Sequence, residues 1–349
     1  MNQIIDIRSD TVTVPTEEMR EAMRRAPVGD SWFGEDPTVR QLEEIAAEKV
    51  GKEAALFVPS GTMGNLTAVL THTQRGTQAI LEQDCHIYYY ELGSISGLAG
   101  VLPRLVEGDR GGVNPTDIET HLSLTSEYFP RTSLICLENT HNRAGGTVTP
   151  PDRMAEIAEV AHRYGVPIHL DGARLFNAAL ALGVEPKAIT QYVDSVMFCL
   201  SKGLGAPVGS LLCGDRAFIQ RAEVVRKMIG GGMRQAGVIA AAGIVALEKM
   251  VDRLVEDHQN ARFLAEGLME IEGLFLDMDT VQTNIVLFDV GGLGVSADPF
   301  VAHLETYGVR TSSFEGTRVR AVAHKDVSRT DIAEALSLIR RAVTDLLIS

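Results

Sequence analysis

The sequence predicts an α/β protein in which helices cover a mostly parallel seven-stranded sheet, followed by a smaller C-terminal α+β domain. Two observations support this fold class. Short apolar runs alternate with helical patterns up to Cys213, and the pattern changes character near residue 252. The predicted domains are therefore residues 1–251 and 252–349. The seven apolar runs are Ala54–Val58, Ala79–Leu81, Val101–Val106, Leu134–Leu137, Val166–Leu170, Val196–Leu200 and Gly209–Cys213.

Two helices are predicted before the first run. After Pro15, Met19 and Met23 lie on the same face of a helical repeat. A second helix is expected to open at Asp36-Pro37 and to end at Gly51. Aspartate and proline favour helix starts, and glycine favours helix ends.

Helical patterns dominate after the last run. Residues 236–247 form an apolar segment that is too short to span a bilayer and is predicted to be a buried helix. An amphipathic helix is expected over residues 251–271. The predicted C-terminal domain then mixes two strands with two helices. These strands are expected at residues 284–290 and 318–322, and these helices at residues 299–306 and 330–347.

Composition and charge exclude several classes of protein. Of 349 residues, 45% are hydrophobic and 22% are charged, which is typical of a globular protein and not of a disordered or fibrous one. Asp and Glu outnumber Lys and Arg by 46 to 32, for a net charge of −14, so neither nucleic acid nor an anionic membrane is an expected partner.

Compartment and metal content follow from the N-terminus and the cysteines. Residues 1–10 lack the apolar core of a signal peptide, and the four cysteines show no CxxC spacing. We therefore expect a cytoplasmic protein with neither a zinc site nor a disulfide framework. The cysteines are Cys85, Cys136, Cys199 and Cys213.

The first candidate site follows the run that ends at Val58. Ser60, Gly61 and Thr62 form a turn that opens a helix, and free backbone N–H groups from Gly61 to Met63 would bind an anion such as phosphate. An ordinary helix cap made by Ser60 is the alternative interpretation.

Two further candidates follow later runs, and in open α/β sheets ligands bind at these strand ends. Asp171 ends one run and is followed closely by Arg174. The alternative for this pair is a capping aspartate with a solvated arginine. Lys202 follows an apolar run expected to be buried, where a lysine needs a functional reason, unless its stem reaches the surface.

Together these features match the needs of pyridoxal phosphate. Its aldehyde takes a lysine, its pyridine nitrogen an aspartate, and its phosphate a helix N-terminus. The joint occurrence of all three, each at a strand end, is far more specific than any one of them.

The chain also resembles the low-specificity L-threonine aldolases, a group within the fold type I pyridoxal phosphate enzymes related to the β-eliminating lyases. The resemblance extends over nearly the whole chain. It implies the aspartate aminotransferase-like fold, pyridoxal 5'-phosphate as cofactor, and a small-molecule amino acid as substrate. The strings that carry it are residues 6–13, 34–38, 138–142, 169–174, 200–205 and 230–235.

This resemblance assigns roles residue by residue. Lys202 is implied to join the cofactor aldehyde, Asp171 to keep the pyridine nitrogen protonated, and His86 to stack on the ring; these three form the expected catalytic set. The implied cofactor-binding residues are Ser60, Gly61, Thr62, His86, Asp171, Arg174, Ser201, Lys202 and Arg234. The implied substrate-binding residues are Ser9, Phe33, Tyr128, Arg174, Lys227 and Arg320. No metal is expected.

The same resemblance predicts assembly and selectivity. The family forms tetramers built as dimers of dimers, in which Lys227 and Arg234 are implied to reach the neighbouring active site. This chain departs from the family at Phe33, where a tyrosine is common, and at Tyr128, where a histidine is often found. Both departures bear on the side chain and the diastereomer that the substrate pocket prefers.

The expected reaction is cleavage of L-threonine, L-allo-threonine or phenylserine to glycine and an aldehyde. Three candidates for the base at the β-hydroxyl stay open: His86, a bound water and Tyr128. The closest alternative activity is a β-eliminating lyase that releases pyruvate and ammonia. A non-catalytic pyridoxal phosphate-binding protein is disfavoured, because such a protein would not need Arg174 and Arg320.

Overall fold

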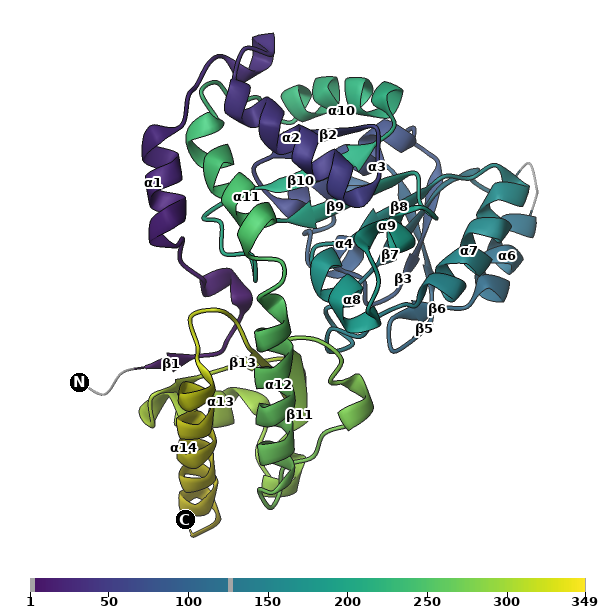
Figure 1. Ribbon diagram of the computed structural model, residues 1–349. Helices are drawn as coiled ribbons and strands as arrows, with labels where there is room; N and C mark the ends of the chain where they lie inside the picture. The colour runs from purple at the N-terminus through teal and green to yellow at the C-terminus, as the bar shows by residue number, and fades with distance from the viewer. Residues whose placement is uncertain (1–3, 125–127, 349) are drawn as a thin grey trace.

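A seven-stranded sheet forms the centre of the larger part of the protein (Figure 1). The computed structural model describes residues 4–124 and 128–348. Within these residues the strands of this sheet lie in the order β2-β10-β9-β8-β7-β3-β4. Their bounds are β2 Ala54–Val58, β3 Gln78–Glu82, β4 Leu102–Val106, β7 Thr132–Glu138, β8 Ile168–Asp171, β9 Ser195–Cys199 and β10 Ser210–Gly214. Every one of the seven apolar runs coincides with one of these strands, which confirms the predicted sheet.

The direction of the strands brings their carboxyl ends to one edge. Strands β4, β3, β7, β8 and β9 pair in parallel, whereas β10 is antiparallel to both β9 and β2. Strand β2 therefore runs in the same direction as β9. The residues that follow β2, β3, β8 and β9 meet at this edge, where ligands bind in open α/β sheets.

Side chains alternate between the two faces of the sheet, as strand geometry requires. Leu170 of β8 belongs to the hydrophobic core that lies under helices α2, α7 and α8, together with the alternate residues of the other strands. Met197 of β9 belongs to a core on the opposite face, under helices α3 and α10. Because Leu170 lies between His169 and Asp171, these two side chains point to the α3 face.

Helix α2 begins and ends at the residues that the sequence indicated. Asp36 caps α2 by accepting the N–H groups of Thr38 and Val39, and Gly51 ends it with a φ of 65°. Both predicted ends of this helix are thereby confirmed. The bounds are α1 Glu17–Arg25, α2 Pro37–Val50, α3 Gly61–His72, α4 His86–Tyr89, α5 Ser94–Gly97, α6 Pro115–Ser123, α7 Pro151–Tyr164, α8 Leu175–Leu182, α9 Pro186–Thr190, α10 Arg216–Met228 and α11 Gly237–Lys249.

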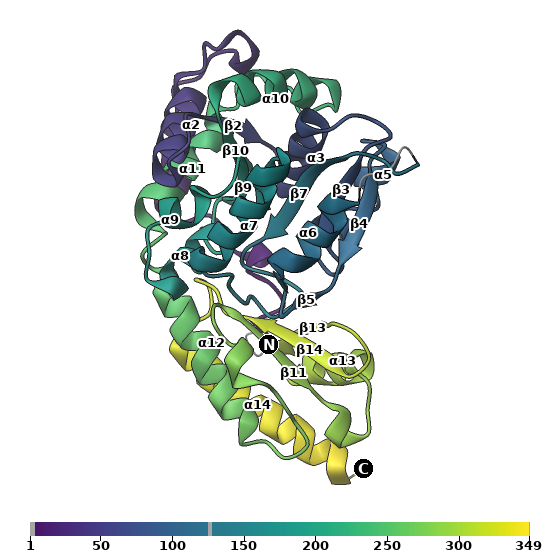
Figure 2. The ribbon, with the colours of Figure 1, turned by 90° about the vertical axis from the view of Figure 1, so that its right-hand side faces the viewer.

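The smaller part has its own sheet and core, and Figure 2 shows it below the larger sheet. Strand β14 lies between β11 and β13, and helices α12 and α14 pack together on its core. The N-terminal strand β1 pairs in parallel with β12, and Ile5 and Ile7 lie in this second core. The bounds are β1 Ile5–Asp6, β11 Ile285–Asp289, β12 Val309–Arg310, β13 Ser312–Ser313, β14 Arg318–Val322, α12 Leu254–Met269, α13 Ala297–Thr306 and α14 Arg329–Ile348.

Short elements complete the described chain. A hairpin of β5 (Gly108–Asp109) and β6 (Gly112–Val113) follows β4. The four cysteines are buried and free. Among residues 4–124 and 128–348, no helix is long and apolar enough to cross a membrane.

Candidate active site

Asp171 lies at the carboxyl end of β8 and is held by two hydrogen bonds. Its Oδ1 accepts the backbone N–H of Ala173 at 3.0 Å, and its Oδ2 accepts Nδ2 of Asn65 in α3 at 2.7 Å. The side chain is almost completely buried. These contacts fix the carboxylate in a single orientation at the edge of the sheet.

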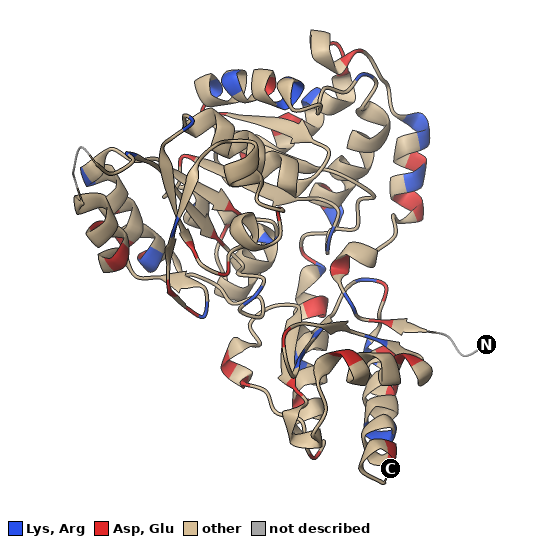
Figure 3. Cartoon of the chain, turned by 180° about the vertical axis from the view of Figure 1, so that it is seen from behind, with Lys and Arg blue, Asp and Glu red and all other residues tan. Residues whose placement is uncertain are grey.

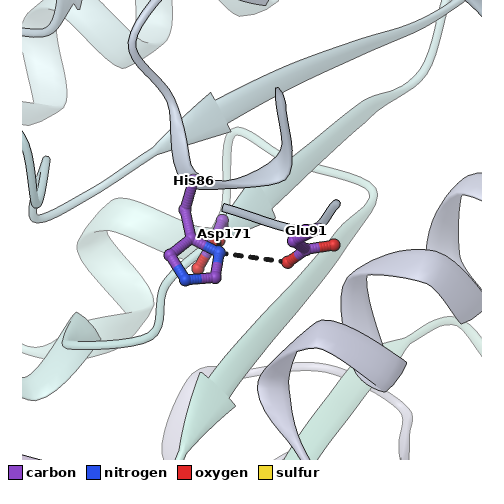
Figure 4. A group of neighbouring side chains, drawn as sticks. All are labelled: His86, Glu91 and Asp171. Atoms are coloured by element: carbon purple, nitrogen blue, oxygen red, sulfur yellow. Dashed lines mark hydrogen bonds and ion pairs between the residues drawn. The ribbon is translucent and has the colours of Figure 1, made fainter. Parts of the chain in front are cut away.

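His86 is the first residue of α4, the helix that follows β3, and its ring lies near the carboxylate of Asp171. Its Nδ1 lies 3.1 Å from Oε1 of Glu91 and 4.0 Å from Oδ2 of Asp171 (Figure 4). Although burial alone would lower the pKa of His86, the hydrogen bond to Glu91 and the charges of Asp171 and Glu138 raise it overall. With Nδ1 engaged, Nε2 is the ring nitrogen left to exchange a proton in the site.

Glu91 is a buried acid beside this histidine. Burial raises the pKa of its carboxyl group, and the hydrogen bonds from His86 and Asn65 act in the opposite direction. Its second oxygen, Oε2, is buried and has no hydrogen-bond partner among the described residues.

Arg174 is buried and paired, contrary to the interpretation of a solvated arginine. Its Nε and Nη2 donate to the two carboxylate oxygens of Asp10, each at 2.7 Å, in a bidentate pair. Burial would raise the pKa of Asp10, but the charge and hydrogen bonds of Arg174 hold it well below its usual range. The same pairing raises the pKa of Arg174.

Arg320 of β14 brings a second guanidinium from the smaller part. Its Nη1 donates to Oδ1 of Asn142 at 3.0 Å, and Nη1 of Arg174 lies 3.5 Å from the same oxygen. Burial, and then the charge of Arg174, lower the pKa of Arg320. Its Nε is buried without a partner in the described chain. Two guanidinium groups that share one neutral acceptor have the donors and the charge that a carboxylate ligand requires.

Ser60 caps α3, as the alternative interpretation held. Its Oγ accepts the N–H of Met63 at 3.2 Å, so that N–H is not free for an anion, and this part of the prediction was wrong. The N–H groups of Gly61 and Thr62 are the first of the helix and have no partner within it. An added Cβ at Gly61 would lie 2.9 Å from Sγ of Cys199, so a side chain cannot enter there.

Lys202 lies in the turn after β9 and is half-buried, whereas β9 itself is fully buried. The turn is held where the N-terminal segment crosses it, because the Thr13 hydroxyl donates to the backbone oxygen of Lys202 at 2.9 Å. The ammonium group is close enough to Asp10 and His86 to shift their pKa values. Ser201 beside it is also half-buried, and Ser9 caps a short 3-10 helix, Asp10–Val12, in the N-terminal segment.

Four other predicted residues are exposed in the single chain and do not join this group. Phe33 is 71% exposed and Tyr128 is 92% exposed. Lys227 lies with its ammonium 4.8 Å from the ring centre of Trp32. Arg234 pairs with Asp30 at 3.0 Å. Figure 3 marks further basic positions in blue on the ribbon of α10, the helix that carries Lys227.

Sequence reasoning gave no role to four residues that build the site. Asp10 and Asn142 stand inside strings that it singled out, and Asn65 follows the turn of Ser60 to Met63, but their partners lie far away along the chain. Glu91 follows His86 by five residues, just beyond the short helix α4. A polar residue inside an otherwise aromatic stretch was the signal available for Glu91.

Comparisons with known proteins identify the family of the chain. Residues 6–290 match the family described as beta-eliminating lyase. A low-specificity L-threonine aldolase 1 of Arabidopsis thaliana is 45% identical over 344 residues, which cover 97% of this chain and 96% of that protein. A low specificity L-threonine aldolase of Escherichia coli K12 is 46% identical over 332 residues, covering 95% of this chain and 97% of its own. The solved structure of a Leishmania major threonine aldolase covers 97% of this chain and 99% of its own, with a TM-score of 0.84 at 19% identity, and shares the fold. The chain thus belongs to the beta-eliminating lyase family, in its low-specificity L-threonine aldolase group.

Proposed function

We propose that this protein is a pyridoxal 5'-phosphate-dependent aldehyde-lyase that cleaves L-threonine, L-allo-threonine and related β-hydroxy-α-amino acids to glycine and an aldehyde. The observation that carries the proposal is the pair of neighbouring guanidinium groups, of buried Arg174 and half-buried Arg320, at the sheet edge that also holds Asp171, His86 and Lys202. The names of the relatives support the same reaction.

The residues present fit the cofactor. Asp171 offers a fixed buried carboxylate for the pyridine nitrogen, the start of α3 offers the free N–H groups of Gly61 and Thr62 for the phosphate, and Lys202 offers an amine for the aldehyde. We assign the face of the ring to His86. When bound, pyridoxal phosphate withdraws electrons from the Cα of an attached amino acid and so weakens a bond at that carbon.

Side chains of the protein then select which bond at the substrate Cα breaks. We assign the substrate carboxylate to Arg320 and Arg174, and also to Ser9, which precedes Asp10 in the sequence. Holding this carboxylate orients the Cα–Cβ bond of the substrate. We assign the proton of the β-hydroxyl group to Nε2 of His86, which would accept it directly or relay it through water. Tyr128 is the weaker candidate for this base, since a phenol has an ordinary pKa of about 10.

Product identity is the test of this reaction. Purified enzyme with bound cofactor is incubated with L-threonine, L-allo-threonine and phenylserine, and glycine, aldehyde, pyruvate and ammonia are measured. Glycine with equimolar aldehyde is the expected result. Pyruvate with ammonia would instead establish the β-eliminating activity that the family description names.

We further infer a homotetramer, built as a dimer of dimers, in which Arg234 and Lys227 serve the neighbouring site. Their exposure in the single chain supports this, as does the exposed apolar surface near them at Phe33 and Met228. Mixing inactive Lys202→Ala chains with inactive Arg234→Ala chains is expected to restore part of the activity through hybrid dimers. No recovery after demonstrated subunit exchange would contradict a shared site.

We also propose a division into two domains and a cytoplasmic location. Residues 1–251 and 252–349 would form the cofactor domain and the small domain, with the N-terminal strand crossing onto the small one. Four buried free cysteines are consistent with a reducing cytoplasm.

A further inference from the structure

In the site, the buried carboxylates of Asp171 and Glu91 both accept hydrogen bonds from the side-chain amide of Asn65. Nδ2 of Asn65 lies 2.7 Å from Oδ2 of Asp171 and 2.8 Å from Oε1 of Glu91. Asn65 is fully buried, and both of its N–H hydrogens are used by these contacts. One side chain of α3 therefore holds Asp171 directly and His86 through Glu91.

A chain of side chains leads away from Asn65 under α3. Its Oδ1 lies 3.1 Å from Nε2 of His169, and Nδ1 of His169 lies 2.9 Å from Oγ of Ser195. Ser195 Oγ in turn lies 2.8 Å from Nε2 of His72. His169 and Ser195 are fully buried, and His72 is half-buried against the ring of Phe218.

Sheet register and helix period place these groups in line. His169 of β8 is opposite Ser195 of β9 in the parallel ladder, and both side chains point to the α3 face. Asn65 and His72 are seven residues apart in α3, which is two helical turns, so they lie on the same face of the helix. The hydrogen-bonded series of side chains thus forms because one helix, α3, lies across the two neighbouring strands β8 and β9.

The direction of every hydrogen bond follows from Asn65. Carboxylates accept and do not donate, so the amide must present its NH2 group to Asp171 and Glu91 and its oxygen to His169. Nε2 of His169 must then carry the hydrogen, which leaves Nδ1 as the acceptor for the Ser195 hydroxyl.

The hydrogen bond between His72 and Ser195 runs in the same direction as the others. With its hydrogen given to His169, the oxygen of Ser195 accepts the N–H from Nε2 of His72. Burial keeps both imidazoles neutral, because it lowers the pKa of His169 to about 3 and of His72 to about 4. All donors therefore point toward the carboxylates, and each bond polarises the next.

We propose that His72, Ser195, His169 and Asn65 form a one-way positioning chain that aims the Asp171 carboxylate at the cofactor ring. This inference rests on the proposed function, since Asp171 is taken to bind the pyridine nitrogen. Removing a member lets the amide of Asn65 turn, and Asp171 then loses the donor that fixes Oδ2. The chain acts through Asp171 and touches neither substrate nor cofactor.

Ser195→Ala breaks the chain two residues away from Asp171 with little change in volume. Apoenzyme is titrated with pyridoxal phosphate, and the dissociation constant and the visible absorption band of the complex are recorded. Loss of one hydrogen bond is expected to raise the dissociation constant about fivefold and to shift the band. Ser195→Thr keeps the hydroxyl and should restore both values.

A second break and a matched control separate positioning from a general packing defect. His169→Gln retains an amide donor near Nε2 and should bind the cofactor better than His169→Phe. His258→Gln alters another largely buried histidine, one bonded to Asn177 at 3.1 Å outside the chain, and should leave the dissociation constant and the band unchanged. Thermal unfolding of each variant confirms that it is folded.

Ring tautomers give a measurement that needs no turnover. Nitrogen NMR of ring-labelled histidine in the holoenzyme, assigned with the His169 and His72 variants, should show both rings protonated on Nε2. Protonation of His169 on Nδ1 would overturn the proposed direction. Parental cofactor affinity and spectrum in Ser195→Ala would overturn the positioning chain while leaving the proposed function standing, whereas a parent enzyme that binds no pyridoxal phosphate would overturn both.

Discussion

Replacing Asp10 by asparagine removes the counter-charge of a buried arginine. Both side chains of the Asp10–Arg174 pair are nearly inaccessible to solvent, with 0% and 5% of their surface exposed. Asparagine keeps one acceptor oxygen but turns an NH2 group toward the guanidinium, so one of the two 2.7 Å hydrogen bonds becomes a contact between donors. Breaking a buried ion pair on one side costs about 3–5 kcal/mol.

The loss can be expressed as a change in melting temperature. With about 2.1 cal/mol/K of unfolding entropy per residue, a chain of 349 residues converts a loss of about 4 kcal/mol into a Tm lower by about 5 °C. The pKa of Asp10 is lower in the folded chain than its ordinary value of 3.8, so this stabilisation is present above that pH and is lost as the pH falls further. The difference in Tm between parent and Asp10→Asn should therefore narrow in acid.

The same substitution should weaken substrate binding. A guanidinium that has lost its bidentate partner no longer holds one orientation, and loss of a charged hydrogen bond lowers kcat/KM by about tenfold to a hundredfold, mostly through KM. Thermal unfolding and steady-state kinetics of the holoenzyme measure both effects. Asp277→Asn, which breaks the exposed pair with Arg110, is the matched control and should change neither value appreciably. A parental Tm and KM in Asp10→Asn would refute the view that Asp10 holds Arg174 in place.

Five other substitutions test separate parts of the structure. Lys202→Ala should abolish both turnover and the visible band of the holoenzyme, and borohydride labelling of a different lysine in the parent would contradict this assignment. Phe33→Tyr and Tyr128→His should each shift the ratio of kcat/KM for L-threonine over L-allo-threonine, because a polar contact that separates β-epimers is worth about 1–3 kcal/mol; unchanged ratios in both would remove these positions from selectivity. Burial raises the pKa of Glu43 from 4.5 to about 7, so the folded chain keeps a proton that the unfolded chain loses, and stability falls as the pH rises between these values. Glu43→Gln should therefore raise the Tm at about pH 8 but not at about pH 4, and an equal effect at both would contradict that pKa. Arg320→Met should raise the Tm of the substrate-free enzyme while increasing KM severely, and a lower Tm would show that the guanidinium is not destabilising.

Strand ends were the part of the site that could be predicted from the sequence. Asp171 stands directly after one apolar run and Lys202 stands two residues after another, so the direction of a parallel sheet was enough to bring them to one edge. Helix ends such as Gly51 were equally predictable, because capping depends on neighbours within a few residues. The fold class, the seven strands and the family resemblance were all confirmed.

Partners across elements could not be predicted. Asn65 contacts Asp171 across 106 positions in the chain, and Arg174 contacts Asp10 across 164. Such pairs depend on sheet register and on how one helix lies over two strands, and neither quantity leaves a periodic signal in one sequence. Arg234 is exposed in the single chain, and the role that we propose for it in a neighbouring site came from the family resemblance alone, because no local pattern distinguishes it from an ordinary surface residue.

Arg174 and Arg320 differ in the groups that surround their guanidinium charges. Asp10 raises the pKa of Arg174, whereas burial and the charge of Arg174 lower the pKa of Arg320. The fold thus pairs one guanidinium directly with a carboxylate, whereas the other donates to a neutral amide and has an Nε without a partner among the described residues. A buried charge without a partner destabilises a protein, and such groups persist where a ligand supplies the missing charge. We therefore propose Arg320 as the group whose charge the substrate carboxylate neutralises, and Arg174, already held by Asp10, as the group that fixes the position at which it does so.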